Sequence, residues 1–208
     1  MADTLDILTL DEAKRALNIP LADTSFDTEV ASYVTAVSQR IDDLCGPVVQ
    51  RTITGEAHDG GRSFIFPVHT PVASVTSIAQ YLSGTATTLT AETVSTSTST
   101  NYLLTDASTH ASLIRRRSSW SDSVFTDGRA NVVITYVAGR FANTAAVSPK
   151  FKQGAAKMLS VMWKGDQGAG TVTFGAPVGD DDLGIIGFAI PRAVLELLAE
   201  EIRPKVIA

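Results

Sequence analysis

The sequence predicts an α+β protein: a small bundle of about four helices with a β-rich module inserted between the second and third helices. Two observations support this prediction. Apolar residues recur at helical spacing near both ends of the chain, whereas residues 48–137 alternate as strands do. The chain has 208 residues, 44% of them hydrophobic, which is enough for a substantial core. The predicted parts are residues 1–47, 48–140 and 141–208.

The N-terminal part is predicted to hold two helices. Thr9 and Glu12 have the spacing of a capping box, and the helix that they open should end before Pro20. Gly46 followed by Pro47 should end the second helix, whose apolar residues recur at steps of four and three. These apolar residues are Phe26, Val30, Val34, Val37, Ile41 and Leu44.

The middle part is predicted to be rich in short strands. The candidate strands are 48–54, 63–66, 71–78, 102–104, 112–115 and 131–137. The period of 71–78 is imperfect, which suggests a turn leading into a strand. Residues 83–100 contain twelve Ser or Thr and a single charge, Glu92. This run fits either a linker or a hairpin, and we favour a mobile hairpin or long loop.

The C-terminal part is predicted to return to helix. Ser148 followed by Pro149 is a good helix start, and a helix with an apolar face should follow. Glycines between 165 and 184 indicate a flexible loop, with a short strand at 171–174. Pro191 should open a last helix that Pro204 ends. The apolar face of the first of these helices comprises Phe151, Ala155, Leu159, Met162 and Trp163.

Charge and composition exclude several classes of protein. The net charge of −5 argues against a strongly basic nucleic-acid binder, and the acidic excess lies in residues 1–46, with nine acids and three bases. No apolar run approaches the length of about 20 residues that spans a bilayer. The acidic start does not resemble a secretory signal. A single cysteine, Cys45, allows no internal disulfide. We therefore expect a soluble chain made in a reducing cytosol.

The sequence offers no catalytic constellation. His58, His69 and His110 do not have the spacing of metal ligands, and His58 with Asp59 beside a Gly-Gly turn is better explained as a surface loop. Ser160 lacks the motif of a nucleophilic serine. The glycines of 165–170 follow a helix, unlike those of a phosphate-binding loop. Asp180–Asp182 could hold a divalent cation, although a solvated acidic loop fits better. We expect no enzyme, cofactor or metal, and an inert Cys45.

Arg115, Arg116 and Arg117 form the densest basic cluster. On a strand, Arg116 would face away from its two neighbours. The cluster could contact phosphate or an acidic partner. We favour a solvated edge strand that its charges protect from pairing with other chains.

The ordered combination of these elements resembles the head–tail connector, or adaptor, proteins of long-tailed bacteriophages. The resemblance rests on the opening stretch 8–14, the helix end at 38–46 and the stretches 71–78 and 133–139, followed by the Pro149-led helix with Trp163. Residues 190–198 are similar to the closing helix of connectors in phages of actinobacteria. The resemblance covers nearly the whole chain, and the β module looks like an elaboration of a smaller helical core.

The resemblance implies a structural role in head completion. Such proteins form a ring of about twelve copies under the portal protein, because a ring that matches the portal symmetry closes without unpaired interfaces. The ring extends the channel through which DNA passes without sequence-specific binding. It also gives a stopper, a tail-terminator protein or the tail a docking surface. The implied location is the virion neck, after assembly in the host cytoplasm.

Two sets of residues are candidate contacts. The C-terminal end should reach toward the portal, although its leucines could instead complete the core; this set is Pro191, Arg192, Leu195, Leu198, Arg203, Lys205, Val206 and Ile207. Acidic and basic helices could meet between neighbouring subunits, and this set is Lys150, Lys152, Lys157, Asp42 and Asp43. The alternatives are a neck stopper or tail-completion protein, a surface-binding β module with the Ser/Thr run at its binding edge and, last, a hydrolase.

Overall fold

The computed structural model describes residues 4–107, 109–166 and 190–202, and it confirms the α+β class. The chain divides into two compact units. The helical unit consists of Met1–Val49 and Phe141–Ala208, and the β unit of Gln50–Arg140. Among the described helices, none is long and apolar enough to cross a bilayer.

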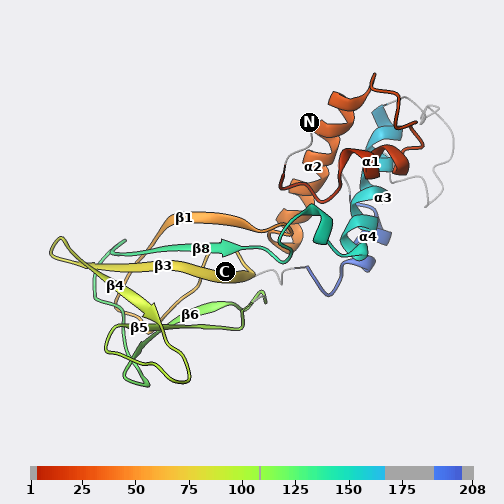
Figure 1. Cartoon of the computed structure of the whole chain (residues 1–208). Coiled ribbons are helices and arrows are strands. Elements are labelled where there is room, and N and C mark those ends of the chain that lie inside the picture. Colours follow the sequence, from red (N-terminus) through yellow and green to blue (C-terminus); the bar gives the residue numbers. More distant parts are fainter. Residues whose placement is uncertain (1–3, 108, 167–189, 203–208) are drawn as a thin grey trace, which may run out of the picture. The chain divides into compact units, whose positions relative to one another are not determined.

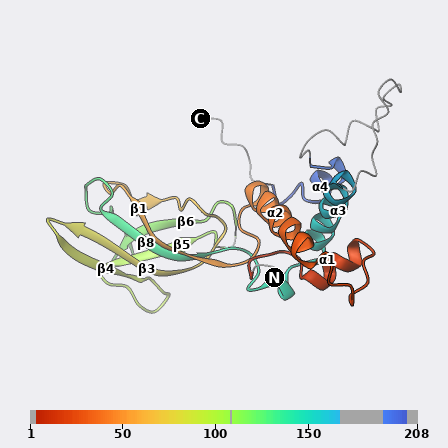
Figure 2. The ribbon, with the colours of Figure 1, turned by 90° about the horizontal axis from the view of Figure 1, so that it is seen from above.

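The helical unit is built on α2 (Asp27–Cys45) and α3 (Pro149–Asp166), which pack against each other (Figures 1 and 2). The shorter α1 (Leu10–Ala16) contacts both, and α4 (Arg192–Leu197) packs on α3. Of the predicted stripe of α2, Val30, Val34, Val37 and Ile41 are buried in the core. Phe26, at the start of the helix, is 38% exposed, and Leu44 is only partly buried. A short 3₁₀ helix, η1 (Thr144–Ala146), precedes α3.

The predicted start of α1 is confirmed in detail. Thr9 Oγ1 accepts from the backbone N–H of Glu12, and Glu12 Oε2 accepts from the backbone N–H of Thr9, as in a capping box. Lys14, on the same helix, is buried. Its Nζ donates to the carbonyls of Leu21 and Asp23 and to Asp27 Oδ1, at 3.0, 2.6 and 2.7 Å. Lys14 thereby fastens the loop between α1 and α2.

The described residues of the β unit form eight strands. Seven follow one path of hydrogen-bonded neighbours, β1-β8-β3-β4-β5-β6-β2, and β7 pairs with β6. Every pairing is antiparallel except that of β4 with β5. The strands are β1 (Arg51–His58), β2 (Phe64–Ile65), β3 (Val72–Leu82), β4 (Thr85–Ala91), β5 (Asn101–Thr105), β6 (Leu113–Ser118), β7 (Ser121–Asp122) and β8 (Val132–Ala138).

The path bends at β4, so β1, β8 and β3 lie over β5 and β6 (Figures 1 and 2). One apolar core fills the space between these layers. Its largest fully buried side chains include Tyr136, Phe125, Ile78, Ile114 and Ile134. Both layers therefore contribute to a single sandwich-like core.

The structure corrects one strand prediction and accounts for two other features of the strand pattern. Val48 and Val49 do not begin β1 but are buried in the helical core, where Val49 bridges to Phe141. The imperfect period of 71–78 has a physical cause, because β3 has register shifts against β8 on both sides of Val75. The Ser/Thr run is no linker: its first part forms the β3–β4 turn and β4, and a loop follows.

Candidate interaction surfaces

Two of the four lysines of α3 meet acids of their own chain. Lys152 Nζ lies 2.5 Å from Glu12 Oε1 on α1. Lys150 Nζ lies 3.3 Å from Glu201 Oε1, beyond α4. Lys157 is exposed and makes no ion pair within the described part of the chain. Of the three lysines predicted to contact a neighbouring subunit, Lys157 is thus the one left available.

Of the two acidic residues at the end of α2, one has a partner in its own chain and the other is exposed. Asp42 Oδ1 accepts from the backbone N–H of Val48 at 2.9 Å. The carbonyl oxygen of Asp42 accepts from the backbone N–H of Gly46. Asp42 therefore shapes the exit of α2. Asp43 is exposed to solvent.

The described C-terminal residues separate into core and surface. Pro191 is the N-cap of α4, and Arg192 Nε pairs with Glu196 Oε1 at 2.9 Å in solvent. Leu198 is 1% exposed and packs beside Gly154 of α3, so it completes the core, whereas Leu195 is 36% exposed. Several predicted features lie outside the described residues: Arg203, Lys205, Val206, Ile207, the strand at 171–174 and Asp180–Asp182.

His58 and the backbone of His69 adjoin one hydrogen-bonded cluster of the β unit, whereas His110 Nε2 lies 2.7 Å from Arg140 Nη2. His58 Nε2 lies 2.6 Å from Glu56 Oε1, and not against Asp59, whose carboxylate accepts from the backbone N–H of Ala130. The other oxygen of Glu56 accepts from the hydroxyl of Tyr136 at 2.7 Å. Burial alone would raise the pKa of Glu56, but hydrogen bonds from Tyr136, Val68 and His58 outweigh it and lower that pKa. This cluster joins β1 to β8.

The remaining reactive side chains are engaged or buried. Ser160 donates its hydroxyl to the carbonyl of Ala156, one helical turn earlier. Cys45 is a free cysteine, fully buried in the helical core. Within the described residues, no three His, Cys, Asp or Glu side chains come close enough to hold a metal ion.

The expectation of an edge strand for Arg115–Arg117 is wrong. Strand β6 lies between β5 and β2, because Phe64 and Ile65 pair with it from a distant part of the sequence. Arg116 does face away from its neighbours, but into the protein. It is 6% exposed and donates to the carbonyls of Asn101 and Ser99 at 3.0 and 2.9 Å, and to that of Arg117. Burial lowers the pKa of Arg116.

Arg117 organises the loop that follows β4. Its Nε donates to Glu92 Oε2 at 2.8 Å, its Nη1 to Asp122 at 2.5 Å and its Nη2 to the carbonyl of Trp120 at 2.7 Å. Ser97 donates to the other oxygen of Glu92 at 2.6 Å. The hydrogen bonds from Ser97 and Arg117 lower the pKa of Glu92. The single charge of the Ser/Thr run is therefore compensated.

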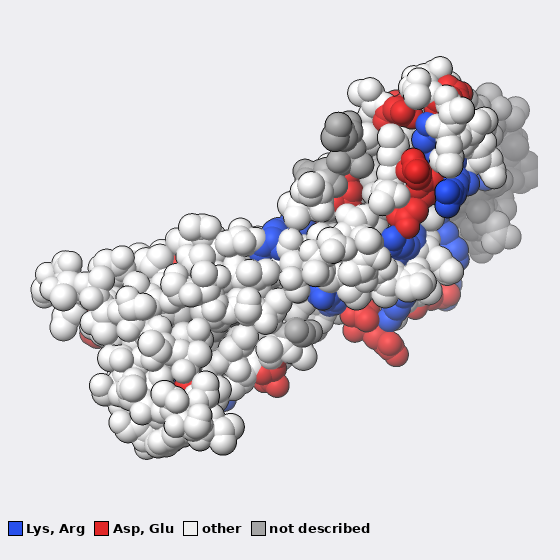
Figure 3. All heavy atoms as spheres, viewed as in Figure 1, with Lys and Arg blue, Asp and Glu red and all other residues white. Residues whose placement is uncertain are grey.

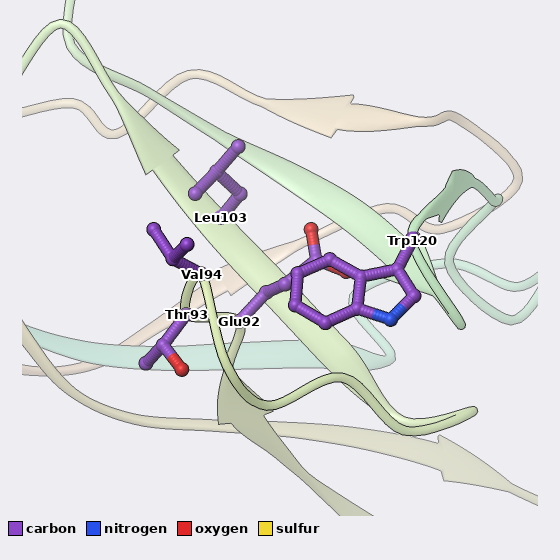
Figure 4. A pocket seen from close by; sticks show the side chains of 5 residues that line it. All are labelled: Glu92, Thr93, Val94, Leu103 and Trp120. Carbon is purple, nitrogen blue, oxygen red and sulfur yellow. The ribbon is translucent and has the colours of Figure 1, made fainter.

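Trp120 forms one wall of a shallow hollow of about 290 Å³ beside this network. Figure 4 shows its indole opposite Val94 and Leu103, with Glu92 between them and Thr93 beside Val94. The side chain of Trp120 is 51% exposed and Val94 is completely exposed. The lining of the hollow is mostly apolar.

Sequence reasoning missed Trp120 because it stands alone in a polar stretch. The structure shows why it is exposed. Ser118 pairs with Ser121, so Ser119 and Trp120 form a two-residue turn, with φ angles of 48° and 68°. A bulky residue rarely adopts this left-handed conformation, which costs about 1 kcal/mol. The sequence feature that could have indicated an exposed binding residue is a tryptophan within a short polar run.

Comparison with known proteins finds solved structures with a similar fold but no matching sequence family. No family model matches the chain, and no curated protein matches it. Among solved structures, the chain resembles a protein from the neck of an empty GTA particle computed with C6 symmetry. The TM-score is 0.59 at 17% identity, over 97% of this chain and 92% of that one. A chain from the virion of a native gene transfer agent particle matches with a TM-score of 0.55, at the same identity and coverage.

These similarities span both units, because 97% of the chain takes part. The inserted β unit is therefore a feature of the shared fold. At 17% identity the likeness establishes the fold alone, and the function is argued separately below.

Proposed function

We propose that the chain is a structural head-to-tail adaptor of a phage-like particle. It forms a ring beneath the portal, extends the DNA channel and offers a docking surface to the next neck protein or the tail. The observation that carries the proposal is the fold match over 97% of this chain to a neck protein of a gene transfer agent particle. The resemblance noted in the sequence supports the same role. The location we propose is the virion neck, after assembly in the host cytoplasm.

The copy number proposed is about twelve, because a twelve-fold ring matches the portal and also satisfies the C6 symmetry of the neck to which the chain is similar. A ring of six obeys the same symmetry. The runner-up function is a neck stopper or tail-completion protein, with which the same symmetry is compatible. The mass of the assembled ring distinguishes the two. Either role is structural and requires no catalytic residues.

The test is to mix the purified chain with the portal ring encoded near it and to image the mixture by electron microscopy. We expect an added ring of density at the narrow end of the portal. Bare portals with dispersed chains would overturn the adaptor role. Repeating the experiment with tails would then test the docking surface.

We propose that the C-terminal end contacts the portal. Among the described residues of the predicted set, Arg192 and Leu195 are exposed, whereas Leu198 belongs to the core. Residues 203–208 include Arg203, Lys205, Val206 and Ile207, a basic and apolar mixture suited to docking. Deleting residues 204–208 should abolish portal binding and leave the thermal unfolding temperature unchanged. Unaltered binding would refute this contact.

We also propose that Lys157 of one subunit pairs with Asp43 of the next. Both side chains are exposed, whereas Lys150, Lys152 and Asp42 have partners inside their own chain. Lys157→Glu and Asp43→Lys should each impair ring formation, and the double variant should restore it, because the pair sets register. Lys164→Glu is the matched control on the same helix. Normal rings from both single variants would exclude the pair.

A further inference from the structure

The turn between β3 and β4 is an exposed apolar tip. Ser83 and Gly84 have φ angles of 49° and 81°, as the two central residues of a type I′ hairpin turn do. Leu82 is 62% exposed and Tyr81 is 41% exposed. The last pair of β3 with β8 joins Gln80 to Val132, so the tip extends beyond that strand.

The base of the tip is held firmly. The backbone N–H of Tyr81 donates to the carbonyl of Asn131 at 2.8 Å, and Asn131 Nδ2 donates to the carbonyl of Tyr81 at 3.2 Å. Asn131 also binds Gly60 and Thr126, so it joins three segments at this place. A tip fixed in this way loses little conformational freedom when it binds a partner.

The hairpin also lacks charge. Residues 76–91 include no Asp, Glu, Lys or Arg. In Figure 3 the visible face of the β unit is almost entirely uncharged, whereas charges cluster on the helical unit. Exposed leucine and tyrosine without nearby charge are typical of surfaces that another protein covers.

The hollow beside Trp120 has the properties that such a tip requires. Its volume of about 290 Å³ is enough to receive one large protein side chain. The charge of Glu92 in its wall is compensated by Arg117. Trp120 supplies a large, rigid aromatic wall of the kind that contributes strongly to binding.

The tip and the hollow lie at opposite ends of β4. Thr85 directly follows the tip, and Glu92 directly follows Ala91, the last residue of the strand. Seven residues of strand separate the two features by about 20 Å. The same chain therefore carries a projection and a receptor at different places on one unit. Contacts between unlike surfaces of identical chains repeat around a ring.

We propose that the Tyr81–Leu82 tip of one copy inserts into the hollow of Val94, Leu103 and Trp120 on the next copy. The partner is a second copy of this chain, because each copy presents an uncharged tip and a mostly apolar receptor in which the Glu92 charge is compensated by Arg117. The inference rests on the proposed ring and specifies one contact that closes it. The Ser/Thr run thereby gains a function, since it carries both β4 and the rim of the hollow.

The first test introduces a charge at each partner surface. Leu82→Asp and Val94→Asp should each reduce ring formation on the portal by roughly tenfold or more, because a charge would be buried without a partner. Leu82→Met should assemble normally. Val124→Asp is the matched control, because Val124 is 59% exposed in the same unit and lies outside the tip and the hollow. Normal rings from Leu82→Asp would overturn the inference.

The second test identifies which surfaces meet. Cys45 is buried, so an added cysteine is the accessible thiol. A chain with Leu82→Cys is mixed with a chain with Val94→Cys and treated with a short bismaleimide. We expect a covalent dimer from this mixture, and far less from either chain alone or from Val124→Cys mixed with Val94→Cys. Equal yields from all mixtures would overturn the inference.

Failure of the inference and failure of the proposed function are distinguishable. Wild-type rings on the portal together with normal Leu82→Asp rings would remove the tip contact alone. If the wild type forms no ring on the portal, the adaptor role fails, and cross-linking of the concentrated free chains decides the contact by itself. Melting temperatures of the variants equal to that of the wild type show that the exposed substitutions leave the fold intact.

Discussion

Arg117 Nε lies 2.8 Å from Glu92 Oε2, and this ion pair ties β6 to the first residue after β4. Two strands and the loop between β4 and β5 depend on it, because the same guanidinium also binds Asp122 and the carbonyl of Trp120. Both the Ser/Thr loop and the wall of the hollow are therefore positioned by one side chain. The pair makes the stability of this region depend on pH.

Replacing Glu92 by Gln should destabilise the β unit in a pH-dependent way. The hydrogen bonds from Ser97 and Arg117 hold the pKa of Glu92 in the folded chain below its ordinary value of 4.5. The stabilisation is therefore present above pH 4.5 and is lost as the pH falls through the lowered pKa. Urea unfolding at neutral and strongly acidic pH should show a difference between variant and wild type that disappears in acid. A difference independent of pH would contradict this account.

Replacing Lys14 by Met should destabilise the helical unit by about 2–3 kcal/mol, because two carbonyls and Asp27 would lose a buried donor. Arg15→Met is the matched control, since Arg15 is the exposed neighbour on the same helix, and it should change little. Chemical denaturation of both variants measures the effect. Equal stability of the two variants would mean that Lys14 does not fasten the loop.

Alanine at Gly60 should cost more than alanine at Gly84. A Cβ at Gly60 would lie 1.7 Å from the carbonyl oxygen of Thr126, so the backbone must move, at a cost of about 3 kcal/mol. At Gly84 nothing lies within 4 Å, and the cost is about 1 kcal/mol from its φ of +81°. Thermal unfolding of the two variants tests this order. The reverse order would indicate a different path for the β1–β2 loop.

Alanine at Gly154 should stabilise the helical unit, whereas leucine should destabilise it. A Cβ there would meet Leu198 Cδ1 and Val194 Cγ1 at 3.5 Å, an ordinary contact, and alanine favours helix over glycine by about 1 kcal/mol. Leucine would push α4 away from α3, at a cost of about 1–3 kcal/mol. Melting temperatures compare the three chains. A stabilised leucine variant would show that α4 does not pack at Gly154.

The helices could be predicted from the sequence because their signals are local. The spacing of Val30, Val34, Val37 and Ile41 identifies the buried face of α2, and the residues that cap α1 stand beside it in the chain. Lys14 could not be recognised in this way. It looks like an ordinary solvated lysine, and the carbonyls that it binds become close only when the following loop folds.

The β unit was less predictable because its neighbours are distant in sequence. The alternation that turns Arg116 away from Arg115 and Arg117 is local, but the position of β6 inside the sheet depends on β2, about fifty residues earlier. The position of Leu198 in the core likewise depends on Gly154 of another helix. For the same reason the hollow was not predicted, since Val94 and Trp120 meet only through the folding of β4, β5 and β6.

The bridge between Val49 and Phe141 bears on how the β unit could be inserted into, or removed from, a helical protein. The chain leaves the helical unit after Val49 and returns at Phe141, whose backbone N–H donates to the carbonyl of Val48 at 3.0 Å. The two ends of the insertion are therefore adjacent, and a short turn could replace the β unit without disturbing the helical core. A joint of this kind allows one helical unit to exchange its inserted module while keeping its own fold.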